Sequence, residues 1–207
     1  MKKLLWIGGG AVASVIAIVV VGVIYAYSSL DGVVEVAIER FGGAATKATV
    51  TVDGGTFSPA DGIGTVDGIR IGNPAGFSRN NALEFGAVSM IMNAESVAGG
   101  VLVIKEIRIA APVLFYEIGP AGANLIVIRN NIAAYGESFA ATGSDGAALV
   151  IVENLIIDGG TARYSGGMMP DSTTGPIHLK DVGKEKGGIT LAEAAIRIIN
   201  ALIAATN

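Results

Sequence analysis

The pattern of apolar and polar residues divides the chain into an uncharged N-terminal run, a short helical segment, a long strand-rich region and a final helix. The N-terminal run extends from Leu4 to Tyr27 without a charged residue. A helix of this length, at about 1.5 Å per residue, crosses the ~30 Å hydrocarbon core of a bilayer. A secretory signal has an apolar region of only ~7–15 residues. We therefore expect an uncleaved transmembrane anchor over residues 4–28, with a cleaved signal ending near Ser28 as the alternative.

The residues around this run predict its orientation. Lys2 and Lys3 form a basic tip at residues 1–3, and the positive-inside rule keeps such a tip in the cytoplasm. Residues 29–207 then form a domain on the other side of the membrane. Within the anchor, three consecutive glycines allow another helix to approach closely. These candidate transmembrane packing residues are Gly8, Gly9 and Gly10.

A helical stripe follows the anchor and a strand pattern follows the stripe. Apolar residues of the segment from Leu30 to Phe41 recur on one helical face, and Gly42-Gly43 is expected to end this short helix. From Thr46 to about Ile177 the alternation of apolar and polar residues predicts strands, with turns at Gly, Pro and Asp-Gly positions. The alternation slips around Ala87-Val88, which indicates a bulge.

Three features of this region lead to specific expectations. Residues 124–130 are expected to be a strand, and residues 148–164 a β-hairpin that turns at Asp158-Gly159-Gly160. The runs 101–104 and 125–128 are apolar at every position, so the sheet is expected to have a second apolar face. A terminal helix, a partner subunit or lipid acyl chains are the candidates for covering it.

A short strand pattern recurs three times in the chain. The segment TVDGIRI at 65–71 is similar to VIKEIRI at 103–109 and to IVENLII at 151–157, and each is followed by a Gly or Pro break and an aromatic residue. The unequal spacing argues against a strict solenoid. It favours similar strands added in succession to an antiparallel sheet, with coincidence among Ile- and Val-rich strands as the alternative.

The end of the chain carries a helical signal over residues 190–205. Thr190 and Glu193 have the spacing of a capping box, and an apolar stripe follows them. We expect this amphipathic helix to pack on the sheet. Together these elements predict an α+β fold, in which a transmembrane helix precedes a curved, mainly antiparallel sheet with flanking helices.

Composition and charge narrow the classes of function. Apolar residues make up 51% of the chain and charged residues 15%, which agrees with a membrane segment. Outside Lys2 and Lys3, 12 basic residues stand against 18 acidic ones, a net charge of −6. This balance argues against nucleic-acid binding and against electrostatic attachment to anionic lipid. Cysteine is absent, so the redox compartment cannot be inferred from cysteine usage, and the chain offers no thiolate ligand for a metal.

Several quoted stretches resemble the N-terminal part of AsmA-like proteins of the bacterial inner membrane. They are the anchor, the helix after it, GTVDGIRIGNPAGFS, ALEFG, VIKEIRIAAPVLFYE and Asn124-Leu125, and they span most of residues 1–130. The stretch GPIHLKDVGKEKGGITLAEAAIRIINAL resembles the ending of a small group of such proteins. The resemblance implies a domain in the periplasm with a curved sheet and an apolar concave groove.

The apolar face of the predicted sheet supplies candidate residues, and the resemblance implies a role in the cell envelope. The expected groove or docking residues are Leu83, Phe85, Ile107, Ile109, Phe115 and Leu125. Large AsmA-like proteins are associated with phospholipid transport across the envelope. About 150 residues of strand and loop, at ~3.3 Å per strand residue, are too few for such a bridge. Membrane lipid, other membrane proteins or further copies of this chain are the expected partners.

No residue constellation indicates catalysis. His178 is the single histidine, and no GxSxG elbow accompanies it. The stretch from Gly62 to Gly68 lacks the helix and third glycine of a dinucleotide loop. Aspartates that precede glycine are explained as turn residues, which leaves no predicted catalytic, cofactor or metal residues. An envelope hydrolase that uses His178 is the least favoured hypothesis.

The sequence thus favours a non-enzymatic, membrane-anchored protein with an apolar β groove and a lipid-associated or scaffolding role. The alternative is a structural accessory subunit of a larger membrane complex, which docks through its transmembrane helix and its β domain. In the first hypothesis the apolar surface holds lipid tails or a protein, and in the second the same domain docks on a partner of fixed stoichiometry.

Overall fold

The computed structural model describes residues 34–58, 60–78, 81–110, 112–141, 149–165, 170–173, 175–190, 193–194 and 197. The predicted anchor over 4–28, with its three glycines, lies outside the described residues, as does most of the predicted helix over 190–205. Within the described part of the chain, no helix is long and apolar enough to cross a membrane.

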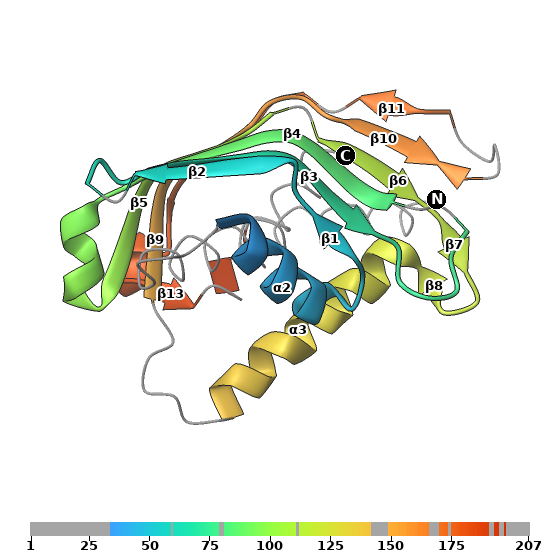
Figure 1. The fold of residues 1–207 in the computed structure, drawn as a ribbon, viewed down its shortest axis with the longest axis horizontal. Helices are drawn as coiled ribbons and strands as arrows, with labels where there is room; N and C mark the ends of the chain where they lie inside the picture. The colour runs from blue at the N-terminus through green and yellow to red at the C-terminus, as the bar shows by residue number, and fades with distance from the viewer. Residues whose placement is uncertain are drawn as a thin grey trace.

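The described residues form an α+β fold with one large mixed sheet and two α-helices on one of its faces (Figure 1). The helices are α2 (Val34–Thr46) and α3 (Asn124–Ala141), and short 3-10 turns are η1 (Ala94–Gly99) and η3 (Lys184–Lys186). The large sheet contains β1 (Val50–Thr51), β2 (Gly54–Ser58), β3 (Ile63–Gly72), β4 (Asn81–Met92), β5 (Val101–Ile109), β6 (Val113–Tyr116), β9 (Leu149–Ile157), β10 (Thr161–Tyr164), β11 (Ser172–Thr173), β12 (Ile177–Val182) and β13 (Ile189–Thr190). A separate small ribbon joins β7 (Ile118–Gly119) to β8 (Gly122–Ala123).

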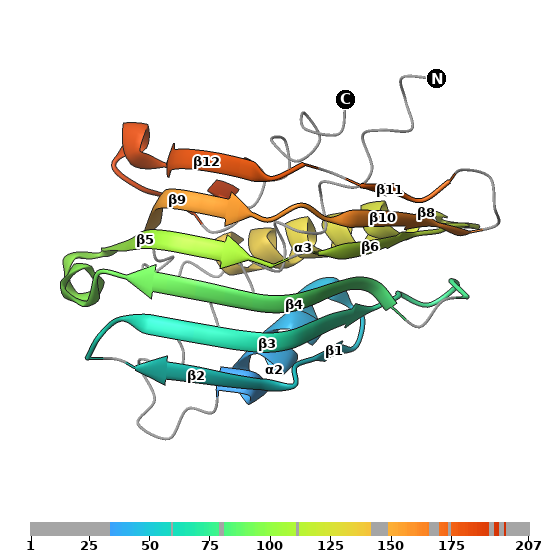
Figure 2. The ribbon, with the colours of Figure 1, turned by 90° about the horizontal axis from the view of Figure 1, so that it is seen from above.

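Several of these strands are halves of longer, interrupted rows (Figure 2). The long strand β4 pairs with β5 along its second half and with β6 along its first half, antiparallel in both cases. On the far side of that row, β9 runs parallel to β5, and β10 runs parallel to β6. The remaining ladders are antiparallel, which confirms the mainly antiparallel sheet that the sequence predicts.

The expected hairpin at 148–164 is wrong, because β9 and β10 are consecutive parts of one row. The residues from Asp158 to Gly160 interrupt this row beside the interruption that Pro112 makes between β5 and β6. Backbone hydrogen bonds join the two interruptions, from Asp158 N to Ile109 O (2.9 Å) and from Thr161 N to Pro112 O (2.9 Å). An Asp-Gly-Gly sequence is typical of a tight turn. Here the chain does not reverse, because β9 and β10 both pair in parallel with the row of β5 and β6.

Two of the three similar strand segments are neighbours in register. Val103 pairs with Ile151 and Ile109 pairs with Ile157, so the segments 103–109 and 151–157 lie side by side in parallel. The first segment follows a different register. Thr65 pairs with Ser89, which pairs with Arg108, so Thr65 stands level with the sixth residue of the second segment and not with its first. The repetition is structural for the second and third copies only.

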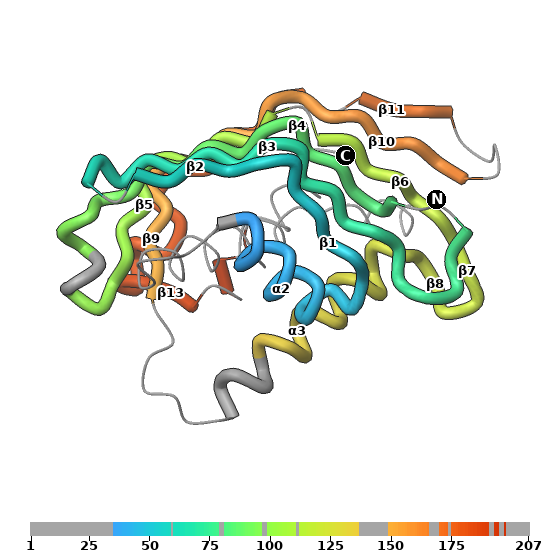
Figure 3. Tube along the Cα trace, in the orientation of Figure 1, coloured from blue at the N-terminus to red at the C-terminus, as the bar shows by residue number. Residues whose placement is uncertain are grey.

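A line of irregular positions crosses the sheet, and we call it the crease. It contains Gly68 of β3 and Gly86 of β4, then the breaks at Ala110 and Pro112, at 158–160 and at 175–176. Gly68 has a φ of 60°, a left-handed conformation that favours glycine. The alternation of burial along β4 slips beside Gly86. The pairing register does not shift at Ala87-Val88 but at Ile91/Met92, so the predicted bulge at Ala87-Val88 is wrong. The sheet arches over the helices, and the Cα trace follows the same arch (Figure 3).

The core lies between the concave face of the sheet and the two helices. Ile38 of α2, and Leu125 and Ile128 of α3, are at most 1% exposed and belong to one cluster with the strand residues. The expected strand at 124–130 is therefore wrong, since these residues are the first turns of α3. A continuous apolar run is compatible with either a buried strand or a buried helix, so its pattern alone does not distinguish them.

The structure changes two further expectations about the helices. Gly42-Gly43 does not end α2, which continues to Thr46, where the hydroxyl donates a hydrogen bond to Gly42 O (2.7 Å). At the other end of the chain, Glu193 N donates to Thr190 Oγ1 (3.1 Å). This is one of the two hydrogen bonds of the predicted capping box, which confirms the start of a helical turn there.

Candidate docking surface

The outer face of the sheet, turned away from α2 and α3, carries a row of three arginines beside the crease. We call Arg70 of β3, Arg108 of β5 and Arg163 of β10 the arginine row. Alternation along each strand places core residues on the concave face and these arginines on the outer face.

The sequence predicted a second apolar face, and the outer face is only partly apolar. Charged side chains in ion pairs occupy it beside the crease. Away from the crease, Ile63 and Ile91 are exposed on it, and Val101 and Val103 are half-exposed.

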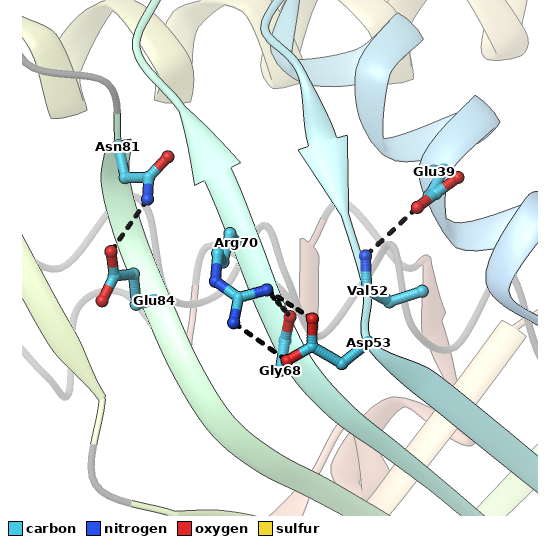
Figure 4. A network of polar contacts seen from close by, with 7 residues as sticks. All are labelled: Glu39, Val52, Asp53, Gly68, Arg70, Asn81 and Glu84. Atoms are coloured by element: carbon cyan, nitrogen blue, oxygen red, sulfur yellow. Dashed lines mark hydrogen bonds and ion pairs between the residues drawn. The ribbon is translucent and has the colours of Figure 1, made fainter.

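Arg70 is the most firmly held member of the row (Figure 4). Its Nη1 and Nη2 donate to the two carboxylate oxygens of Asp53, at 2.6 and 2.9 Å. Nη1 also lies 3.3 Å from the backbone oxygen of Gly68. Glu84, which pairs with Arg70 across the ladder, accepts a hydrogen bond from Asn81 Nδ2 at 2.8 Å. A forked guanidinium–carboxylate contact fixes both side chains, so this end of the row has a defined shape.

Arg108 and Arg163 also face a carboxylate, each through a single, longer contact. Arg108 Nη1 lies 3.1 Å from Asp158 Oδ1, so this pair joins β5 to the break after β9. Arg163 Nε lies 3.9 Å from Asp171 Oδ2, and its guanidinium carbon stands 5.7 Å from the centre of the Phe115 ring. Each arginine has about half of its side-chain surface exposed and lies within ion-pair distance of a carboxylate.

The electrostatics of the row are set by these contacts. The hydrogen bonds from Arg70 hold the pKa of Asp53 below its usual value, and they raise the pKa of Arg70 itself. Both groups are therefore charged at neutral pH. Because these pairs are exposed, they contribute little to stability and remain open to exchange for an acidic group on another molecule.

His178 lies on the same outer face, and its ring contacts an asparagine amide and not a nucleophile. Its Nε2 is 3.2 Å from Asn154 Oδ1, and Asn154 Nδ2 donates to Lys105 O at 3.1 Å. These contacts tie β12, β9 and β5 together across a second irregular line, where Asp181 has a φ of 53°. The arrangement gives His178 a structural partner.

Five of the six predicted groove residues lie in the interior. Leu83, Phe85, Ile107, Ile109 and Leu125 are each at most 2% exposed, and the strands and helices of this chain surround them. Phe115 is half-buried on the opposite face, beneath Arg163. The structure therefore brings the first five together as one core and separates the sixth, so none of the five is offered on an open surface.

Three of the aspartates that precede glycine have side-chain partners of their own. Asp53 and Asp158 hold Arg70 and Arg108, and Asp61 accepts a hydrogen bond from Ser58 Oγ at 2.6 Å. Within the described residues, no group of three or more acidic or histidine side chains is arranged to bind a metal ion. The sequence analysis missed the arginine row. Two of its members could have been suspected from the sequence, because Arg70 and Arg108 pair with aspartates that each precede a glycine.

In comparisons with known proteins, the sequence matches no protein-family model and no curated protein. Its class is therefore defined by its own geometry: an α+β domain whose arched sheet is covered on the concave side by two helices and carries both ion pairs and exposed apolar side chains on the outer side.

Proposed function

We propose that this protein is a non-enzymatic scaffolding subunit of a membrane complex in the bacterial envelope. Its predicted anchor holds the domain at the inner membrane, and the outer face of the sheet docks on an acidic surface of another membrane protein. The family resemblance to AsmA-like proteins and the uncharged run from Leu4 to Tyr27 support the location.

The observation that carries the proposal is the burial of the predicted groove. Residues such as Phe85 and Ile107 are held against α2 and α3 of the same chain, so the concave side offers a packed core instead of a lipid site. The arginines of the arginine row, by contrast, are held in ion pairs and are accessible on the outer face. Arginines that are oriented by a carboxylate are well suited to recognise acidic groups on a protein surface.

Native mass spectrometry of the full chain, extracted gently from its own membranes, tests the proposal. We expect an assembly with integer copies of other proteins. The double variant R108E/R163E is expected to lose these partners, while Arg129→Glu is the matched control, because Arg129 lies exposed on α3 behind the sheet.

Two outcomes would contradict the proposal. A lone chain that carries phospholipid masses would favour the lipid-associated hypothesis. An assembly that survives R108E/R163E unchanged would show that the outer face is not its docking surface.

A further inference from the structure

The helix α2 holds its two acidic side chains against the sheet. It lies under the edge strands β1 and β2 (Figure 2), and Glu39 Oε1 accepts a hydrogen bond from Val52 N at 3.2 Å. Glu35 Oε1 accepts one from Gly55 N at 3.0 Å. Glu35 and Glu39 are one helical turn apart, so both carboxylates lie on the side of α2 that faces this edge. The negative charges of α2 are thus directed toward its own domain.

A different side of α2 is exposed and carries positive charge. Val36, Arg40 and Ala44 recur at every fourth residue, so they share one face of the helix, and all three are exposed, Val36 by 60%. Lys47 follows the last turn, with its N–H still bonded to Gly43 O (3.0 Å), and its side chain is also exposed. We call these four exposed residues the basic stripe: Val36, Arg40, Ala44 and Lys47. Among the ion pairs of the described residues, none involves a residue of the basic stripe.

The basic stripe has the opposite sign to the domain as a whole. Outside Lys2 and Lys3, 12 basic and 18 acidic residues give a net charge of −6, the balance that argued against attachment to anionic lipid. Surface charges act over about 8–10 Å in physiological salt, so the local arrangement and not the total decides what a helix face attracts. Arg40 and Lys47 attract an anionic surface, and the apolar side chain of Val36 fits the boundary between headgroups and acyl chains.

The length of chain before α2 favours lipid over an acidic protein as this anionic surface. Five residues, 29–33, separate the predicted anchor over 4–28 from Val34, where α2 begins. At no more than ~3.6 Å per residue, they keep the first turn of α2 within about 22 Å of the end of that anchor. Each cation near an anionic bilayer gains about fivefold in partitioning. Two cations are too few to bring a free protein to a bilayer, but a tether raises their effective concentration.

We propose that the basic stripe lies on the headgroups of anionic phospholipid in the membrane that holds the anchor. The contact fixes how the domain stands on the bilayer, because α2 packs on the concave side of the sheet and the arginine row lies on its outer face. With α2 against the lipid, the outer face is turned away from the bilayer and toward the proposed partner. The inference rests on the membrane location in the proposed function and does not require docking through the outer face.

The absence of cysteine allows a direct test in the full chain. Ala44→Cys places a single thiol in the basic stripe, and Ser172→Cys places one on β11 as a reference. Each variant is reconstituted in nanodiscs of phosphatidylcholine alone or with about a third of phosphatidylglycerol. The rate of modification by a neutral polyethylene-glycol maleimide is then measured. A neutral reagent is chosen because its concentration near the disc does not depend on the charge of the lipid.

We expect the thiol at position 44 to react about tenfold more slowly in the anionic discs at low salt, and high salt to remove the difference. The thiol at position 172 is expected to react alike in both discs. Adding R40E/K47E is expected to abolish the protection at position 44. The matched control is K105E/K180E, which makes the same change in net charge at exposed positions of β5 and β12. It is expected to leave the protection in place.

Three results would overturn the inference: equal rates at position 44 in the two discs, protection that survives R40E/K47E, or protection that K105E/K180E abolishes as well. The discs contain no other protein, so none of these results bears on docking through the outer face. Failure of the chain to enter the discs would instead refute the predicted anchor, and with it both the proposed location and this inference.

Discussion

The carboxylate of Asp53 lies in the space that a side chain on Gly68 would occupy. A Cβ atom placed on Gly68 would stand 1.9 Å from Asp53 Oδ2, and Arg70 holds that carboxylate in position with two hydrogen bonds (Figure 4). At the crease in β3, the missing side chain of Gly68 therefore leaves space that the carboxylate of Asp53 fills. This contact joins the edge, the crease and the arginine row.

Replacing Gly68 by alanine is expected to destabilise the domain. The residue would keep a φ of 60° and would push Asp53 away from Arg70. We expect a loss of about 1–3 kcal/mol in the free energy of unfolding, measured by urea denaturation. Gly54→Ala is the control, because a Cβ there meets no atom within 4 Å. Equal losses in the two variants would remove the special role of the crease.

The contact between Asp53 and Arg70 is expected to depend on pH. Arg70 lowers the pKa of Asp53 in the folded state, so the stabilisation is complete above the unfolded pKa of about 3.9. It is lost as the pH falls through the lower, folded value. A carboxyl NMR titration checks this. Arg70→Gln is expected to return the pKa of Asp53 toward its ordinary value, and no movement would show that Arg70 is not the cause.

Truncation of the predicted groove residues is expected to lower the free energy of unfolding much more at a core position than at a surface position. Phe85 is 2% exposed, and Phe85→Ala is expected to cost about 3–5 kcal/mol in the free energy of unfolding. Phe115→Ala, on the half-buried outer side, is expected to cost about 1 kcal/mol or less. Chemical denaturation of both variants checks the difference. A mild effect at Phe85 would indicate an open groove instead of a core.

A buried asparagine is expected to determine where α3 begins. Asn124 is fully buried, and its Oδ1 accepts from Leu125 N (2.9 Å) and Glu117 N (3.1 Å). Its Nδ2 donates to Asn73 Oδ1 (2.8 Å) and Phe115 O (2.7 Å).

Asn124→Ala leaves these buried groups without their bonds, so we expect a loss of about 2–4 kcal/mol in the free energy of unfolding. Asn130→Ala, at an exposed site on the same helix, is the control. Thermal or urea unfolding distinguishes the two, and similar values for both variants would contradict the role of Asn124.

The breaks in the strands were predictable from the sequence, but their consequences were not. Pro112 and the Asp158-Gly159-Gly160 stretch are recognisable as interruptions, since proline cannot donate to a ladder and Asp-Gly favours turns. Whether the chain reverses at such a stretch depends on its neighbour. Here the row of β5 and β6 breaks at the same level and runs parallel, so the chain continues past Gly160 in the same direction.

The sequence by itself determined the α+β class, most strands of the central sheet and the helical stripe of α2, because local alternation and spacing encode them. Only the tertiary structure decided that residues 124–130 are helical and that the apolar concave face is closed by α2 and α3. It also decided which carboxylate meets which arginine. An apolar run packs as a buried strand or as a buried helix depending on its neighbours, because its pattern fits both. An ion pair such as Asp53 with Arg70 joins residues of different segments, so its partners are determined only when the sheet is assembled.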